Sequence, residues 1–243
     1  MKKIISYSLW GTSPRYTLGA IANSQQVPVV YPGWTARFYC GTDVPHDILQ
    51  SLMTAGAEII LMDEPNDSRG MFWRFYALAD PEASHIIFRD ADSYLSRREA
   101  AAVNQWVTSN FVGHIMRDHP YHTMPIMGGM WGCKGGVFTD IQDKISAFCP
   151  RDSYNQDQIF LARCIYPKLR EFGCIVHDEF YRYESSAKNF PLPRHDYEFV
   201  GEVILPDGSR DGAWKAIQAY ENNPLEKIKL LYRKYKHKIK FSI

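Results

Sequence analysis

The chain has 243 residues, of which 45% are hydrophobic and 23% charged, and its formal net charge is +1. Such a chain can bury a sizeable core within one domain, which excludes a disordered protein. No segment approaches the ~20 apolar residues that span a bilayer, and we interpret the apolar start at Ile4 as a strand rather than a signal peptide. The five cysteines form no C-x-x-C pair, which favours reduced thiols in a cytoplasmic protein.

Apolar patterns in the first half of the chain alternate between those typical of strands and those typical of helices. The expected strands cover residues 3–10, 36–40, 58–62 and 85–89, and the expected helices cover 15–24, 45–55 and 70–79. Alternation at this spacing predicts an α/β sandwich with parallel strands. In such sheets ligands bind beyond the carboxyl ends of the strands, so residues that directly follow a strand are the first candidates for a site.

The second half continues the pattern less regularly. Helices are expected at 97–107 and at 154–166, the latter ending before Pro167, and strands at 113–116, 124–131 and 173–176. No internal repeat or second domain is visible, so we predict one domain over residues 1–225 and a basic amphipathic tail over residues 226–243. Seven Lys and Arg side chains of this tail stand against the single acid Glu226, and the remaining body is mildly acidic, which disfavours a general nucleic-acid binder.

An acidic triplet, Asp90-Ala91-Asp92, directly follows the expected strand at 85–89. Two carboxylates close to one turn can share a divalent cation, and Mg²⁺ or Mn²⁺ usually takes one or two carboxylates together with phosphate oxygens. Such a metal acts as a Lewis acid that neutralises charge on a diphosphate leaving group. A lone D-x-D sequence is more often a solvated turn, but its place at the end of a strand favours a ligand site.

Four runs, at residues 72–76, 85–93, 125–131 and 155–158, and then His177 follow one another along the chain. In this order they resemble glycosyltransferases of the GT-A fold, and the chain is most similar to family 8-like retaining enzymes and their uncharacterised bacterial relatives. The resemblance implies a three-layer α/β/α sandwich with a mostly parallel central sheet. It also implies a hexosyltransferase-type enzyme that uses Mn²⁺ or Mg²⁺. Its donor would be a nucleotide-sugar, by default a UDP-sugar, and its acceptor would be a glycan or a lipid-linked acceptor.

The same resemblance implies roles for individual residues. Asp90, Asp92 and His177 would hold the metal, Asp157 and Gln158 would lie near the reacting carbon, and Arg74, Gly128 and Gly129 would contact the donor. Four of these residues have a structural alternative. His177 could be a structural histidine, Asp157 and Gln158 could cap a helix, and Arg74 could form a surface ion pair. The chain also departs from the family, because the nearest lysine after His177 is Lys188, and Gly128-Gly129 replaces the usual asparagine-serine-glycine run.

Two further groups are candidates for substrate binding. Arg117 and Asp118 follow an expected strand and could neutralise a phosphate and bind a sugar hydroxyl. A zinc site from Asp118, His119 and His122 has suitable ligand types but poor spacing around Pro120. Trp10 and Tyr16 follow the first strand and could stack on a nucleotide base, or could simply pack against the core.

Other functions stay open alongside the glycosyltransferase. A nucleotidyltransferase would need a Gly-rich phosphate loop, which residues 11–15 imitate poorly, and a relative that binds nucleotide without turnover is a further alternative. The tail combines lysines with apolar side chains, so it could lie on an anionic membrane surface at the inner face of the membrane, bind nucleic acid, or be a solvated helix. We favour the membrane and expect no nucleic-acid partner.

Overall fold

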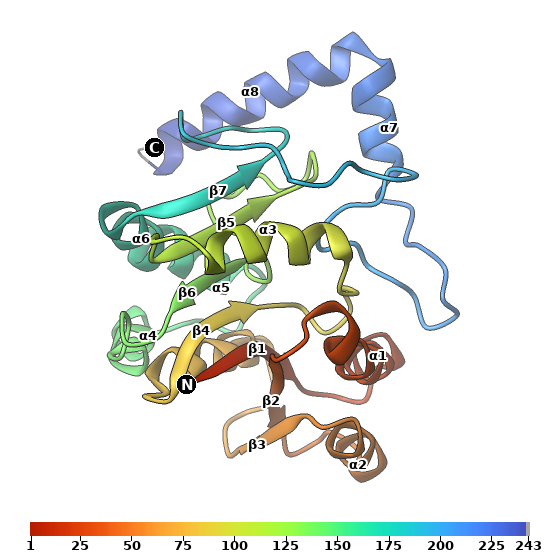
Figure 1. The fold of residues 1–243 in the computed structure, drawn as a ribbon, viewed down its shortest axis with the longest axis vertical. Coiled ribbons are helices and arrows are strands. Elements are labelled where there is room, and N and C mark those ends of the chain that lie inside the picture. Colours follow the sequence, from red (N-terminus) through yellow and green to blue (C-terminus); the bar gives the residue numbers. More distant parts are fainter. Residues whose placement is uncertain (242–243) are drawn as a thin grey trace.

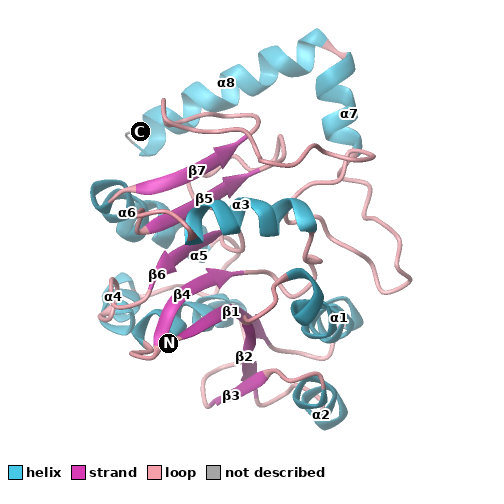
Figure 2. Ribbon diagram, in the orientation of Figure 1, coloured by secondary structure: helices cyan, strands magenta, loops and turns pink. Residues whose placement is uncertain are grey.

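A seven-stranded sheet forms the centre of the computed structural model, which describes residues 1–241 (Figures 1 and 2). The strand order is β3-β2-β1-β4-β6-β5-β7. The strands are β1 (Lys2–Leu9), β2 (Thr35–Gly41), β3 (Glu58–Met62), β4 (Ala83–Phe88), β5 (Gly113–Arg117), β6 (Trp131–Lys134) and β7 (Cys174–Asp178). All neighbouring strands pair in parallel except β6, which is antiparallel to β4 and β5. The predicted α/β class with a mostly parallel sheet is confirmed.

Helices cover both faces of this sheet and complete three layers (Figure 2). One face carries α1 (Pro14–Val30), α2 (His46–Thr54) and α3 (Arg97–Val107), and the other carries the 3₁₀ helix η1 (Ser68–Ala79), α4 (Ile141–Phe148), α5 (Gln156–Phe160), the π-helical turn η2 (Leu161–Ile165) and α6 (Tyr166–Phe172). Successive side chains of a strand point to opposite faces. In β4, Ile86 therefore joins the core under η1 while Ile87 joins the core under α1 and α3.

The helix expected at 15–24 extends to Val30. Two other expected elements also differ from those observed. The helix expected to end before Pro167 continues to Phe172, because the turn at Leu161–Ile165 widens to π geometry and Pro167 falls in the first turn of α6. There its missing N–H removes no helical hydrogen bond. The strand expected at 124–131 is confined to Trp131–Lys134, and residues 124–130 form turns before it.

The chain after β7 packs beyond the edge of the sheet. Residues 179–214 contain only isolated bridges, and then α7 (Lys215–Asn222) and α8 (Pro224–Phe241) follow. Leu230 of α8 packs with Tyr181 and Tyr183 in a small hydrophobic cluster that is separate from the main core. This cluster holds α8 beside β7, the edge strand of the sheet (Figure 1). Within residues 1–241, no helix has both the length and the apolar character to span a membrane.

Candidate functional site

The acidic triplet lies at the carboxyl end of β4, a central strand between β1 and β6. Its turn is held from behind by Asn23 of α1, a fully buried side chain that donates to the carbonyl oxygens of Ala91 and Ser93 at 3.1 Å each. Gly19 of α1 allows this approach, because a Cβ there would overlap the Ala91 carbonyl. The turn is therefore fixed by the packing of α1, which orients the carboxylates that follow.

Asp92 is paired with Arg15 from the first turn of α1. Both Nε and one terminal nitrogen of Arg15 lie 2.7 Å from Asp92 Oδ2. The Asp92 side chain is only 7% exposed, whereas that of Arg15 is 43% exposed. Burial and the neighbouring Asp90 charge raise the pKa of Asp92, against the opposite effect of Arg15. Two carboxylates thus lie close enough to repel each other, and an arginine from another element partly compensates them.

Asp90 belongs to a second ion-pair cluster that is centred on Arg74. This arginine of η1 is 4% exposed and donates to Asp90 Oδ1 and, at 2.8 Å, to Asp157 Oδ2 at the start of α5. Its backbone is fastened to β1, since Ser8 Oγ accepts from the Arg74 N–H at 2.9 Å and Ser6 Oγ donates to its carbonyl at 2.7 Å. The structure therefore brings together three side chains from three separate segments.

Asp157 is the most enclosed acid of this cluster, with 2% exposure. Burial raises its pKa despite the adjacent Arg74 guanidinium. Its Oδ1 atom has no hydrogen-bond partner among the described residues. A buried carboxylate oxygen without a partner costs about 1–3 kcal/mol or more, so it marks a place where a ligand hydroxyl or an ordered water would bind.

Gly128 and Gly129 close one side of the cluster centred on Arg74. A Cβ at Gly128 would lie 2.5 Å from Asp157 Oδ2 and 2.7 Å from a guanidinium nitrogen of Arg74, and a Cβ at Gly129 would overlap the Asp90 carboxylate. Only glycine permits this approach of the backbone to the charged groups. The glycines expected beside the donor therefore lie against the same acids as the other candidates.

A distant segment, residues 201–211, also borders the triplet. Ile204 N donates to the Asp92 carbonyl at 3.2 Å, and Ser93 Oγ donates to the Gly201 carbonyl at 3.2 Å. Ser93 and Val203 form an antiparallel bridge. Neither this segment nor Arg15 and Asn23 was among the residues expected from the sequence, because their proximity depends on long-range pairing that no local motif reveals.

The remaining candidates near the site have unequal surroundings. Tyr16 is 42% exposed, and its ring lies 5.6 Å from the Arg15 guanidinium carbon, which places an accessible aromatic face beside Asp92. Trp10 is half-buried and packs edge-on against Trp73 with ring centroids 6.0 Å apart, as the packing alternative expected. Gln158 follows Asp157 and donates to Asn155 Oδ1 at 3.1 Å within its own turn.

His177 is not part of the acidic site. It lies in β7, which β6 and β5 separate from β4. Its Nδ1 bonds to His114 Nε2 at 2.9 Å and its Nε2 to Gln105 Oε1 at 3.0 Å, so both ring nitrogens are occupied. Burial first, then the charges of Lys188 and Arg98, lowers its pKa to about 4. The expectation that His177 joins Asp90 and Asp92 is wrong in this geometry, and the structural alternative is the one observed.

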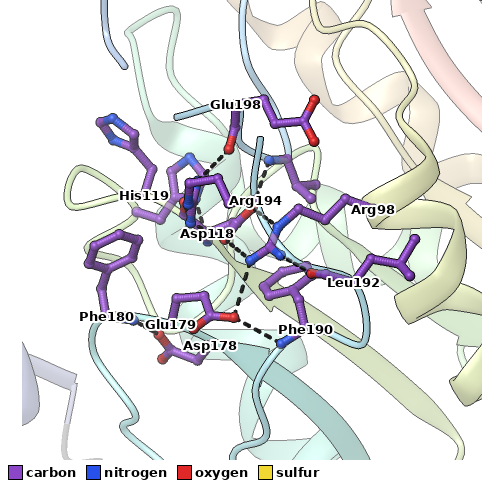
Figure 3. A network of polar contacts seen from close by, with 12 residues as sticks. Arg98, Asp118, His119, Asp178, Glu179, Phe180, Phe190, Leu192, Arg194 and Glu198 are labelled. Carbon is purple, nitrogen blue, oxygen red and sulfur yellow. Dashed lines mark hydrogen bonds and ion pairs between the residues drawn. The ribbon is translucent and has the colours of Figure 1, made fainter. Parts of the chain in front are cut away.

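Arg117 and Asp118 are likewise internal rather than part of a substrate site, which corrects both expectations. Arg117 is fully buried and donates to Asp178 Oδ2 at 2.6 Å and to Glu184. Figure 3 shows Asp118, also fully buried, between two arginines, Arg98 and Arg194. All three side-chain nitrogens of Arg117 and both carboxylate oxygens of Asp118 have partners within the protein, which leaves none for a sugar or phosphate.

The neighbouring histidines form no zinc site. His119 Nε2 donates to the Ala213 carbonyl and its Nδ1 accepts from Tyr121 N, while His122 Nδ1 accepts from Asp118 N. Over residues 1–241 no group of three His, Cys, Asp or Glu side chains is arranged to hold a metal. Any metal held by Asp90 and Asp92 would thus need further ligands from outside the chain.

The donor set at the triplet nevertheless fits such a metal. Arg74 occupies Asp90 Oδ1 and Arg15 occupies Asp92 Oδ2, and the other oxygen of each carboxylate enters no ion pair among the described residues. Mg²⁺ and Mn²⁺ favour hard oxygen ligands and commonly bind through one or two carboxylates plus phosphate oxygens and water. The cation would also offset the Asp90 repulsion, which after burial is the second cause of the raised Asp92 pKa.

The sequence matches no protein-family model and no curated protein. Similar solved structures include a glycosyltransferase involved in the glycosylation of the major capsid of PBCV-1, with 13% identity, a TM-score of 0.49, and coverage of 76% of this chain and 84% of that one. Another is glucosyl-3-phosphoglycerate synthase from Mycobacterium tuberculosis in complex with Mn²⁺, uridine-diphosphate and phosphoglyceric acid, with 10% identity, a TM-score of 0.46, and coverage of 72% and 67%. Likeness of this degree identifies neither the ligand nor the reaction of this chain, and the resemblance to family 8-like enzymes stays a prediction.

Proposed function

We propose that the chain is a metal-dependent glycosyltransferase that transfers a sugar from a nucleoside diphosphate sugar, with UDP as the nucleotide, to a glycan or lipid-linked acceptor in the cytoplasm. One observation carries the proposal. The acids Asp90 and Asp157 lie on the two sides of the Arg74 guanidinium, next to Asp92 and beneath Gly128-Gly129, at the carboxyl edge of a parallel sheet. This edge is where α/β proteins bind ligands.

Each residue of the cluster has a distinct task in this proposal. Asp90 and Asp92 would hold Mn²⁺ or Mg²⁺, and the ion would neutralise the diphosphate as its bond to the sugar breaks. Arg74 would keep Asp90 and Asp157 in position, since its backbone is tied to β1. The unpartnered Oδ1 of Asp157 would accept from a sugar hydroxyl and orient the reacting carbon, with Gln158 beside it. Tyr16 would face the nucleotide.

A thermal-shift screen of nucleoside diphosphates and their sugars, with and without Mn²⁺, tests the proposal. Ligand at a hundred times its Kd stabilises the folded state by about 2.7 kcal/mol, and each kcal/mol raises the Tm of a chain this size by about 2–4 °C. We expect UDP to raise the Tm by about 5–10 °C with Mn²⁺ and far less with EDTA. Equal shifts in EDTA, or no shift with any nucleotide, would contradict the metal-diphosphate site.

The alternatives separate in the same samples. A nucleotidyltransferase would be stabilised by a nucleoside triphosphate. It would release pyrophosphate when a sugar phosphate is added as the second substrate. A non-catalytic relative would bind UDP-sugar but would show no hydrolysis of it, not even a slow one. We expect slow Mn²⁺-dependent hydrolysis of the donor, which is measured by release of UDP.

Arg15 yields a prediction of opposite effects on metal and nucleotide. In this structure its guanidinium neutralises Asp92, so it competes with a divalent cation, and once displaced its exposed side chain could reach the diphosphate. We expect Arg15→Gln to bind Mn²⁺ several-fold more tightly without nucleotide, and UDP about tenfold more weakly when Mn²⁺ is saturating.

Titration calorimetry measures both affinities, with Arg15→Lys as the control that keeps the positive charge. The lysine variant should resemble the wild type in its Mn²⁺ affinity. If Arg15→Gln weakened Mn²⁺ and UDP binding together, Arg15 would be a residue that only supports the turn.

A further inference from the structure

Helix α8 is held in one orientation by its inner face. Leu230 is 3% exposed and packs against Tyr181 and Tyr183, and His237 Nδ1 bonds to the Thr123 carbonyl at 3.0 Å. The guanidinium carbon of Arg233 lies 6.0 Å from the centre of the Tyr121 ring. Contacts along the whole helix therefore determine which side of α8 faces outward.

The outward side carries a continuous apolar stripe. Its members are Leu225, Ile228, Tyr232, Tyr235 and Ile239, which are 63%, 61%, 70%, 65% and 82% exposed. Their spacing of three, four, three and four residues confines them to an arc of roughly 80° on an α-helix, opposite Leu230 and His237. A stripe of this kind on the solvent side of a docked helix contributes nothing to the core of the chain.

Lysines border this stripe on both sides. At helical spacing Lys229, Lys236 and Lys240 lie along one border, and Lys227 and Lys238 lie along the other, beyond the exposed Leu231. The one acid of the helix, Glu226, pairs with Lys229 at 2.6 Å. The surface presented by α8 is thus apolar in its middle and positively charged at its margins.

We infer that this face of α8 lies in the interface of an anionic membrane. The five apolar side chains would enter the boundary between headgroups and acyl chains, and the lysines would meet the lipid phosphates. The tyrosines suit this depth because a ring with a polar end favours the interface. The inference goes beyond sugar transfer and stands whether or not the chain has that activity.

Charge and shape favour a membrane over nucleic acid. A nucleic-acid surface would contact cations at the centre of the face, where α8 has leucine, isoleucine and tyrosine instead. A bilayer surface offers an apolar layer beneath a charged one, and this order matches the stripe and its borders.

Cosedimentation of the full chain with vesicles tests the inference. We expect binding to vesicles of phosphatidylglycerol and phosphatidylcholine in equal parts, and little binding to phosphatidylcholine alone. The variant Ile228→Ser/Tyr232→Ser/Ile239→Ser should bind the anionic vesicles at least about tenfold more weakly. The variant Lys227→Gln/Lys236→Gln should lose about fivefold per lysine at low salt, and its binding should depend less on salt.

A control variant, Val29→Ser/Leu61→Ser, removes exposed apolar side chains that lie elsewhere on the surface and should bind like the wild type. Each variant should keep the wild-type Tm, because all the substituted side chains are exposed or border the exposed face. A Tyr232→Trp variant adds a second readout: the difference between its fluorescence and that of the wild type, which has six tryptophans, should shift to shorter wavelength on anionic vesicles. Unchanged vesicle binding by the triple serine variant, no fluorescence shift, or displacement of the vesicles by an oligonucleotide would overturn the inference.

Discussion

Replacing Asp92 with asparagine is expected to abolish Mn²⁺-dependent UDP binding and donor hydrolysis while the chain stays folded. Asparagine has the same shape but no charge, so a hard cation loses a carboxylate ligand. Loss of a residue that only hydrogen-bonds to a metal ligand lowers metal affinity about 10–100-fold. Loss of the ligand itself should therefore lower metal affinity at least about a hundredfold. The lost ion pair with Arg15 should matter little to stability, because that arginine is 43% exposed.

Titration with Mn²⁺ and then UDP measures this effect, and Asp63→Asn is the matched control. Asp63 is an exposed acid that also follows a strand, β3, but lies outside the cluster. It should leave both affinities unchanged. Wild-type UDP affinity in Asp92→Asn with Mn²⁺ present would show that the triplet does not hold the metal.

The pH dependence of metal binding follows from the same carboxylate. Burial and Asp90 raise the pKa of Asp92, so protons compete with the cation at a higher pH than at an ordinary aspartate. Metal affinity should reach its full value at a pH above the pKa of Asp92, where the carboxylate is ionised. It should fall as the pH drops through this pKa.

Among the variants proposed for this protein, Asp118→Ala should lose the most free energy of unfolding. It should have little direct effect on ligand binding. Asp118 accepts two bonds from Arg98 at 2.9 Å each, one from Arg194 at 2.6 Å and one from Val200 N at 3.0 Å (Figure 3). Its removal leaves two arginines without their shared carboxylate. Breaking a buried pair in this way costs about 3–5 kcal/mol, which lowers the Tm by about 10 °C.

Urea unfolding and UDP titration of the folded variant together check this expectation. Glu171→Ala removes one acid from a surface ion pair with Lys168 and should leave the Tm nearly unchanged. If Asp118→Ala kept its Tm but lost UDP binding, Asp118 would be a substrate residue after all, as the sequence had suggested.

Local pattern was sufficient to predict the sheet class and the end of β4. The apolar run that leads into Asp90 predicts a strand. It also predicts where the acids lie, because central parallel strands end at the edge of the sheet where ligands bind. Arg74, Asp157 and Gly128-Gly129 also lie against that edge in the structure. Their roles in binding stay proposals.

Strand order was the information that local pattern lacked. His177 lies in the last two residues of a strand, close to the strand end that was expected, but β7 lies beyond β6 and β5, and nothing in the residues around His177 reveals that position. Arg117 likewise ends a strand, β5, and Asp118 follows it. Their partners Asp178, Glu184, Arg98 and Arg194 come from distant segments, so their burial could not be read from their neighbours.

The acidic turn is completed by segments that are remote along the chain. The Arg15–Asp92, Arg74–Asp157 and Ser93–Gly201 contacts span 77, 83 and 108 residues. Contacts of such long sequence separation form late in folding because long loops must close first. During synthesis, a growing chain that has emerged only as far as the turn after β4 therefore carries Asp90 and Asp92 without Asp157 or the segment that borders them. The proposed nucleotide site is thus complete only near the end of translation rather than with the first folded strands.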